Sequence, residues 1–126
     1  MRHDEFLVKV GEHGGPTDRD HADRATRVVL EDLGKRLQGN EPRDLAAQLP
    51  AELQEPLLRH VGAAETDDDV DAFLRRVAEH EGHGCDPEQA REHTRAVLST
   101  MASFVSDGEI ADLRSQLPAG FAPLFA

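Results

Sequence analysis

Histidine and cysteine, the side chains that often bind transition metals, gather in one short stretch of this sequence. His80, His83 and Cys85 follow the spacing His-x-x-His-x-Cys, and His93 comes soon after them. Imidazole nitrogen and thiolate sulfur suit Zn²⁺, which proteins usually hold with tetrahedrally arranged ligands. The stretch therefore predicts a zinc or small-ligand site formed by His80, His83, Cys85 and His93. A glycine-rich polar loop whose histidines face solvent is the competing interpretation.

Recognised catalytic motifs are absent from the sequence. It has no Gly-x-Ser-x-Gly elbow, no phosphate-binding glycine loop with lysine, and no His-Glu-x-x-His motif. Cys85 could act as a nucleophile only beside a histidine, and the spacing does not fix such a contact. We therefore expect a protein that is not an enzyme, with zinc as its one cofactor candidate. A thiol enzyme or hydrolase of an unrecognised type is the remaining alternative.

The balance of charge limits the partners that this protein can bind. Asp and Glu total 25 and Lys and Arg total 14, so the net charge is −11. Nucleic acids and anionic membranes attract clusters of Lys and Arg, so neither is an expected partner. The expected partner is a protein, or a second copy of this chain in a homodimer. A single cysteine, and no apolar run of the roughly 20 residues that span a bilayer, predict a cytoplasmic protein.

Helices are the elements expected to position these groups. The chain has five Phe, no Trp and no Tyr, so its core must come mainly from Leu, Val and Ala, which favours packed helices over a sheet. Apolar residues recur at helical spacing, with charged residues on the opposite face. The predicted helices include residues 4–10, 20–37, 51–59 and 87–105, and a short helix between Asn40 and Pro50.

The second half of the sequence repeats the first. The segment from Glu41 to Ala51 returns as the segment from Glu109 to Ala119. A unit of about 60 residues rarely buries enough apolar surface alone, so two such units are expected to share one core. We therefore predict a single all-α domain over residues 1–126, a compact helical bundle whose two units have a pseudo-two-fold relation. Repeat 1 covers residues 4–60, an acidic connector covers 61–69, and repeat 2 covers 70–126.

Several polar residues recur at the same place in both units. The Asp and Gln of each short helix stand at i and i+4 and share a helix face, and an Arg recurs on each long helix. We expect each Arg to pair with the Asp of its unit and so to tie the long helix to the short one. The alternative is a repeated polar surface that binds a partner protein. These structural or interaction residues are Arg27, Asp44, Gln48 and Pro50, and their counterparts Arg95, Asp112, Gln116 and Pro118.

Capping and buried residues can also be predicted. Leu45 and Leu113, on the two short helices, are expected in the core, and so is the apolar tail from Phe121 to Phe125, for which a contact surface is the alternative. Side-chain oxygens of Ser, Thr, Asp and Asn cap helices by accepting bonds from free backbone N–H groups. The predicted caps are Thr17 or Asp18, Asn40, Thr66 with Asp69, and Asp86 with Gln89.

Several stretches together resemble a known family. They are Asp-x-Phe-Leu-x-x-Val from Asp4, Ala-Thr-Arg-Val-Val-Leu-Glu-Asp-Leu-Gly-Lys-Arg-Leu from Ala25, Asp-Leu-Ala-Ala-Gln-Leu-Pro from Asp44, and the second set that ends in Gln-Leu-Pro. Over residues 4–125 the chain resembles the bacterial family called domain of unknown function 2267. The resemblance implies a small all-helical bacterial protein built from a duplicated unit, and it implies no activity.

A duplicated helical unit without a reaction signature favours one functional class. We expect a non-enzymatic protein-interaction or regulatory module, whose candidate contact surfaces are the two Gln-Leu-Pro segments and the apolar tail. The alternative is a metal or small-ligand binding protein that uses the loop containing His80, His83 and Cys85.

Overall fold

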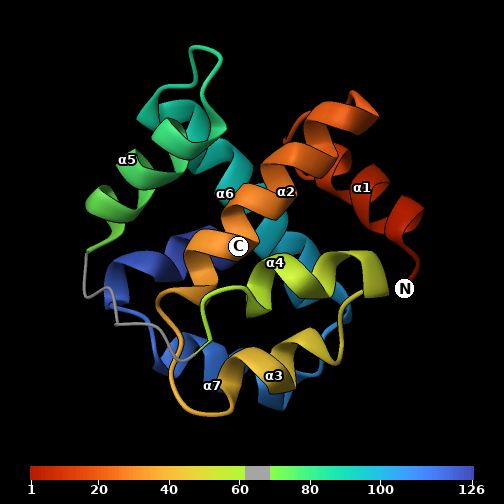
Figure 1. Cartoon of the computed structure of the whole chain (residues 1–126), viewed down its shortest axis with the longest axis vertical. Helices are drawn as coiled ribbons and strands as arrows, with labels where there is room; N and C mark the ends of the chain where they lie inside the picture. The colour runs from red at the N-terminus through yellow and green to blue at the C-terminus, as the bar shows by residue number, and fades with distance from the viewer. Residues whose placement is uncertain (62–68) are drawn as a thin grey trace.

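Every regular element in the described part of the chain is helical (Figure 1). The computed structural model describes residues 1–61 and 69–126, and no β-strand occurs there, so the all-α prediction is confirmed. None of the helices in these two ranges is both long enough and apolar enough to cross a membrane. The helices are α1 (His3–Glu12), α2 (Arg19–Gly34), α3 (Glu41–Ala46), α4 (Gln54–Leu58), α5 (Val70–Glu81), α6 (Pro87–Phe104) and α7 (Asp107–Ser115), with the 3₁₀ helices η1 (Ala51–Leu53) and η2 (Ala119–Phe125).

Local sequence explains most helix starts. The Asp18 carboxylate accepts the His21 N–H at 2.9 Å and begins α2, as one of the two predicted candidates. Asp86 begins α6 with the predicted reciprocal bonds to Gln89, at 2.8 and 3.0 Å. The prediction for Asn40 is wrong, because its backbone has helical angles and its side chain makes no cap bond.

The remaining predicted cap and the connector lie partly outside the described residues. Thr66 and residues 62–68 of the connector fall in the gap between the two ranges. Asp69 itself is described, and its carboxylate accepts the Ala72 N–H at 2.8 Å, so Asp69 is the residue that begins α5.

The second helix ends earlier than its apolar pattern predicts. It stops at Gly34, and the chain continues to Leu37 as a turn in which the Arg36 N–H bonds the Leu33 carbonyl at 2.9 Å. At this point α4 crosses α2 so closely that a Cβ on Gly34 would lie 2.4 Å from the Leu57 carbonyl oxygen. Only glycine permits this approach of the two backbones.

The first helix of each half packs against the long helices of both halves. Helix α1 contacts both α2 and α6, and helix α5 contacts both α6 and α2. One hydrophobic cluster contains buried residues from both halves, including Leu45 and Leu113, which are fully buried as predicted. Phe121 and Leu124 of the tail are buried in the same cluster, so the prediction that the tail belongs to the core is confirmed for these residues.

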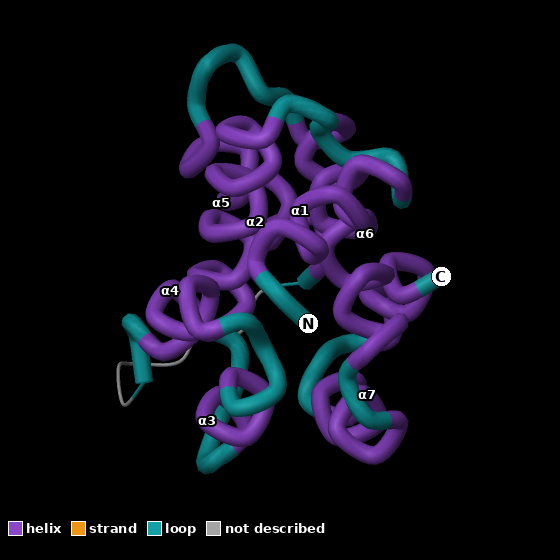
Figure 2. The backbone as a smooth tube through the Cα atoms, turned by 90° about the vertical axis from the view of Figure 1, so that its right-hand side faces the viewer, coloured by secondary structure: helices purple, strands orange, loops and turns teal. Residues whose placement is uncertain are grey.

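The two short helices α3 and α7 lie side by side at one end of the molecule (Figures 1 and 2). The loop between α5 and α6 lies at the opposite end (Figure 1), where it lines a pocket together with the first turns of α2. Each of these two ends contains a cluster of polar side chains.

Candidate metal centre

A pocket of about 400 Å³ opens where the N-terminal turn of α2 meets the end of α5 and the start of α6. His21 and Arg24 line it from α2, Glu81 from α5, and His93 from α6. The pocket thus gathers side chains that lie far apart in the sequence. Of the predicted zinc ligands, His83, Cys85 and His93 line this pocket.

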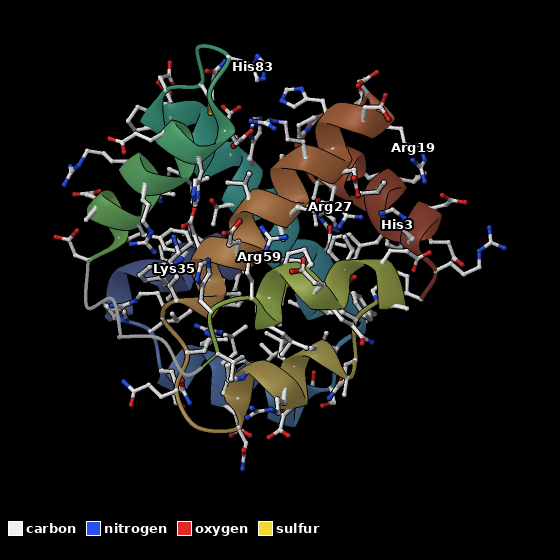
Figure 3. The ribbon with its side chains drawn as sticks, in the orientation of Figure 1. His3, Arg19, Arg27, Lys35, Arg59 and His83 are labelled. Atoms are coloured by element: carbon white, nitrogen blue, oxygen red, sulfur yellow. The ribbon has the colours of Figure 1, made fainter. Side chains whose placement is uncertain are left out.

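The loop between α5 and α6 reverses the chain within a few residues. Gly82, His83 and Gly84 all have positive φ angles, of 64°, 53° and 77°. This backbone conformation is open to glycine and strained for His83, which carries a Cβ. His83 lies on the loop that projects from the top of the molecule in Figure 3. A strained histidine at the rim of a pocket is consistent with a functional loop.

Glu81 and His93 form the floor of the pocket. The imidazole Nδ1 of His93 lies 2.9 and 2.8 Å from the two carboxylate oxygens of Glu81. The side chains are 3% exposed for Glu81 and 12% exposed for His93, so the pair is removed from bulk water. A buried carboxylate requires a compensating partner, and His93 supplies it here.

His21 brings a second imidazole to the same carboxylate. Its Nε2 lies 3.9 Å from Oε1 of Glu81, and its ring meets the His93 ring edge to face, with centroids 5.4 Å apart. One ligand atom from each of His21, Glu81 and His93 can be chosen so that all three lie within 4.8 Å of one another. Two imidazole nitrogens and a carboxylate oxygen form a typical donor set for Zn²⁺.

Cys85 lies beside this trio as a protonated thiol. Its S–H donates to Oε2 of Glu81 across 3.6 Å. Burial, and next the negative charge of Glu81, raise the pKa of the Cys85 thiol to about 11. Because only the thiolate is a strong ligand, Cys85 would join a metal only if the metal displaced its proton.

Arg24 holds the end of α5 in place against α2. Its guanidinium donates to the Glu81 carbonyl from Nε at 3.2 Å and from Nη2 at 2.6 Å, and to the His80 carbonyl at 3.4 Å. These carbonyls are the groups that a helix C-terminus leaves without intrahelical partners. Arg24 therefore fixes the backbone of Glu81 and so the position of the carboxylate.

His80 does not join the other predicted ligands at the pocket. Its Nδ1 lies 2.9 Å from Oδ2 of Asp32, a fully buried carboxylate on α2. Arg76 and Lys35 also pair with this carboxylate, at 3.0 and 3.3 Å. Successive residues on a helix point in different directions, so His80 faces α2 while Glu81 faces α6. His80 ties α5 to α2 in this structure.

Two members of the trio were missed by sequence reasoning. Glu81 stands inside the predicted stretch, but a search for His and Cys alone passes over it. His21 lies in another helix far away along the chain, and only the packing of α2 against α5 and α6 brings it to the pocket. A search for His-carboxylate combinations would have included Glu81, and no local pattern indicates His21.

The repeated glutamines bond within the chain. Gln48, which follows α3, accepts the Ser106 N–H at 2.8 Å and donates to the Ser106 hydroxyl at 3.2 Å. Gln116, which follows α7, accepts the Gln38 N–H at 2.8 Å and donates to the Gln38 carbonyl at 3.4 Å. Each glutamine therefore joins the end of its own short helix to the turn before the other short helix.

The predicted arginine–aspartate ties do not form. Arg27 bonds Asp23, one turn away on α2, at 2.9 Å, and His3 binds the same carboxylate at 2.8 Å (Figure 3). Asp23 and Arg27 stand at i and i+4 on α2, where two side chains share a helix face, and this local pair replaces the predicted one. Within residues 1–61 and 69–126 no ion pair joins Arg95 to an acidic residue. Asp44, Asp112 and Pro118 are exposed, and Pro50 is buried.

Comparison with known proteins gives a family. The family model described as uncharacterized conserved protein (DUF2267) matches residues 3–124, nearly the whole chain. No curated protein matches the sequence.

Proposed function

We propose that this chain, which belongs to the DUF2267 family of uncharacterized conserved proteins, is a non-enzymatic module that binds a divalent transition metal such as Zn²⁺. The ligands are His21, Glu81 and His93. The observation that carries the proposal is the convergence of these three ligand atoms within 4.8 Å at the floor of a solvent-connected pocket. They come from three helices, so metal binding would also hold the helices together.

The spacing of the trio suits a zinc ion after a small movement. Zinc–ligand bonds of 2.0–2.2 Å in a tetrahedron place neighbouring ligand atoms about 3.4 Å apart. The His93–Glu81 pair, at 2.8 Å, is slightly closer than this, and the His21–Glu81 pair, at 3.9 Å, is slightly farther. His21 is 53% exposed on the pocket wall, so a change of rotamer can move it toward the ion without disturbing the core.

The fourth ligand is a water molecule or Cys85. The Cys85 thiol holds its proton because its pKa is raised to about 11 by burial and by Glu81. The positive ion would neutralise Glu81 and remove part of this effect, and thiol binding would release a proton. We therefore expect metal affinity to rise with pH.

Zinc titration of the purified, chelator-treated chain tests the proposal. We expect one Zn²⁺ per chain with micromolar or tighter affinity, and a loss of about a hundredfold in affinity in His21→Ala, which removes a direct ligand. His83→Ala is the matched control, since His83 lines the same pocket without belonging to the trio. This variant should change affinity less than about threefold.

The two variants also separate this proposal from the sequence-based ligand set. A large loss in His83→Ala with none in His21→Ala would return the site to the loop residues. Failure of the wild-type chain to bind Zn²⁺ at about 100 µM would contradict the proposal, because sites with three protein ligands bind more tightly.

We also infer that the fold arose from a duplicated unit with a pseudo-two-fold relation. The reciprocal bonds support this: Gln48 reaches the turn at Ser106, and its counterpart Gln116 reaches the counterpart turn at Gln38. In a two-fold arrangement, a residue of the first half contacts the second half, and its counterpart makes the same contact in return. Glu41 and Glu109, also counterparts, meet each other between the short helices.

An interaction or regulatory role, with a protein or a second copy of the chain as partner, stays a prediction. Its proposed contact residues Gln48 and Gln116 have partners within the chain, so they favour it less than the sequence suggests. A bacterial origin and a cytoplasmic location also stay predictions, the second supported by a single free cysteine.

A further inference from the structure

Helices α3 and α7 meet at the opposite end of the molecule (Figure 2). A second polar cluster lies at this contact. Glu41 opens α3 and Glu109 lies in the first turn of α7. One carboxylate oxygen from each of Glu41, Glu109 and Asp44 can be chosen so that all three lie within 4.8 Å of one another. Unlike the metal centre at the other end, this cluster offers oxygen ligands alone.

Glu41 is the buried member of the cluster. The residue is only 7% exposed, and no donor group of the described residues bonds its Oε1. Oε1 of Glu109 is likewise buried without a donor, and the two carboxylates face each other. Among the residues that the structure describes, no Lys or Arg forms an ion pair with either side chain. Burying a carboxylate oxygen without a hydrogen-bond donor costs free energy. A proton or a cation between the carboxylates would remove that cost.

We propose that Glu41, Asp44 and Glu109 form a second site, which binds a hard divalent cation, Ca²⁺ or Mg²⁺. The inference goes beyond the proposed transition-metal function, since it concerns other residues and another class of ion. Carboxylate oxygens are the preferred ligands of hard cations, and waters complete their coordination.

The dimensions of the cluster suit such an ion. Calcium–oxygen distances of about 2.3–2.6 Å allow ligand oxygens on one ion to be as far as about 5 Å apart, and the three carboxylates lie within that span. Glu41 forms the buried side of the site, Glu109 is partly buried, and the exposed Asp44 forms the open side. An ion can therefore enter from solvent past Asp44.

A proton occupies this place when no cation is bound. Burial, and next the neighbouring carboxylate of Glu109, raise the pKa of Glu41 to about 8, and Asp112 and Asp44 add to the effect. At neutral pH the Glu41–Glu109 pair thus keeps one proton. The cation would replace that proton, so binding should release about one proton per ion and strengthen as pH rises.

Calorimetric titration of the chelator-treated chain with Ca²⁺ and with Mg²⁺, at pH 6 and pH 8.5, tests the inference. We expect one ion per chain and tighter binding at pH 8.5, with proton release measured from the heats in two buffers. Asp44→Asn should weaken binding by about tenfold or more, because it removes a charged ligand. The control is Asp107→Asn, an exposed carboxylate in the first turn of α7 that lies outside the trio and should change affinity less than about threefold.

Several outcomes would overturn the inference. Equal losses in the two aspartate variants would mean that the ions respond only to general negative charge. No heat of binding for either ion at pH 8.5 would show that the pair accommodates a proton alone. His21→Ala should leave Ca²⁺ and Mg²⁺ binding unchanged, so this site and the proposed zinc site can fail independently.

Discussion

The candidate metal centre and the contact between α3 and α7 are built from different kinds of residue. In the α3–α7 contact, Glu41 and Gln48 of the first half meet Glu109 and Gln116, which occupy the same positions of the second half. In the candidate metal centre, the position of His93 corresponds to Ala25 when the two halves of the sequence are aligned. Ala25 is fully buried and has no group that could bind an ion. At the α3–α7 contact, the residues that join the two halves are repeated, and at the pocket they are not.

For the duplicated unit that we propose, this difference indicates how one copy could gain a site that the other lacks. At the junction of α3 and α7, Glu41 and Glu109 lie together, so a change in either one alters the surroundings of both. Residues far from the junction, such as His93 and Cys85, face different neighbours in each half and are free to change in one of them. The predictions below test this contrast, beginning with the largest expected effect.

Leu45→Ala and Leu113→Ala should each lower the free energy of unfolding by about 2–5 kcal/mol, because each removes a fully buried side chain and leaves a cavity. If the two halves share one core, both variants should unfold in a single transition and lose similar stability in urea. Val8→Ala, at a position that is 64% exposed, should change stability by less than about 0.5 kcal/mol. Two separate transitions in either leucine variant would show that each half has a core of its own.

Alkylation of Cys85 tests the unrepeated pocket. With the thiol pKa raised from 9.0 to about 11, the thiolate fraction near neutral pH should fall about a hundredfold, and the iodoacetamide rate with it. The control is the same chain in urea, where burial and Glu81 no longer act on the thiol. Equal rates for folded and unfolded chains would show that Glu81 and the pocket do not control Cys85.

Sequence reasoning predicted the parts of the fold that depend on neighbours in the chain. The caps Asp18 and Asp86, and the buried positions Leu45 and Leu113, follow from helix geometry and apolar spacing, and all four are confirmed. The cap predicted at Asn40 is wrong, and it shows that a suitable side chain is not sufficient when its own backbone is helical.

The candidate site could be predicted only in part, because it depends on contacts between distant helices. His83, Cys85 and His93 reach the pocket, since they lie near one turn of the chain. His80 contacts the buried Asp32 instead of the pocket, and His21 of α2 contacts Glu81 in the pocket. These two outcomes depend on how α2 packs against α5, which no local pattern specifies.

Glu41→Gln should make stability less dependent on pH. Because the folded pKa of Glu41 is raised from 4.5 to about 8, its contribution is fully present below pH 4.5 and is lost as pH rises toward 8. Glutamine cannot ionise, and its amide can donate to Glu109, so at pH 9 in EDTA the variant should be more stable by about 1–3 kcal/mol. Thermal unfolding at pH 4.5, 7 and 9 measures this. A variant that loses stability at pH 9 would contradict the account of the repeated pair.

Gln48→Ala and Gln116→Ala should give the smallest effects, about 0.5–1.5 kcal/mol each, because each removes hydrogen bonds that are partly exposed to water. Their similarity is the informative quantity, and urea unfolding of both variants and of the double variant measures it. Each amide bonds the turn before the opposite short helix, so equivalent contacts should have equal effects. In the double variant, α3 and α7 would lose both links, and the losses should add if the two bonds act independently. A large loss in one variant with none in the other would show that the repeated positions no longer have equivalent roles, and the contrast with the unrepeated pocket would then fail.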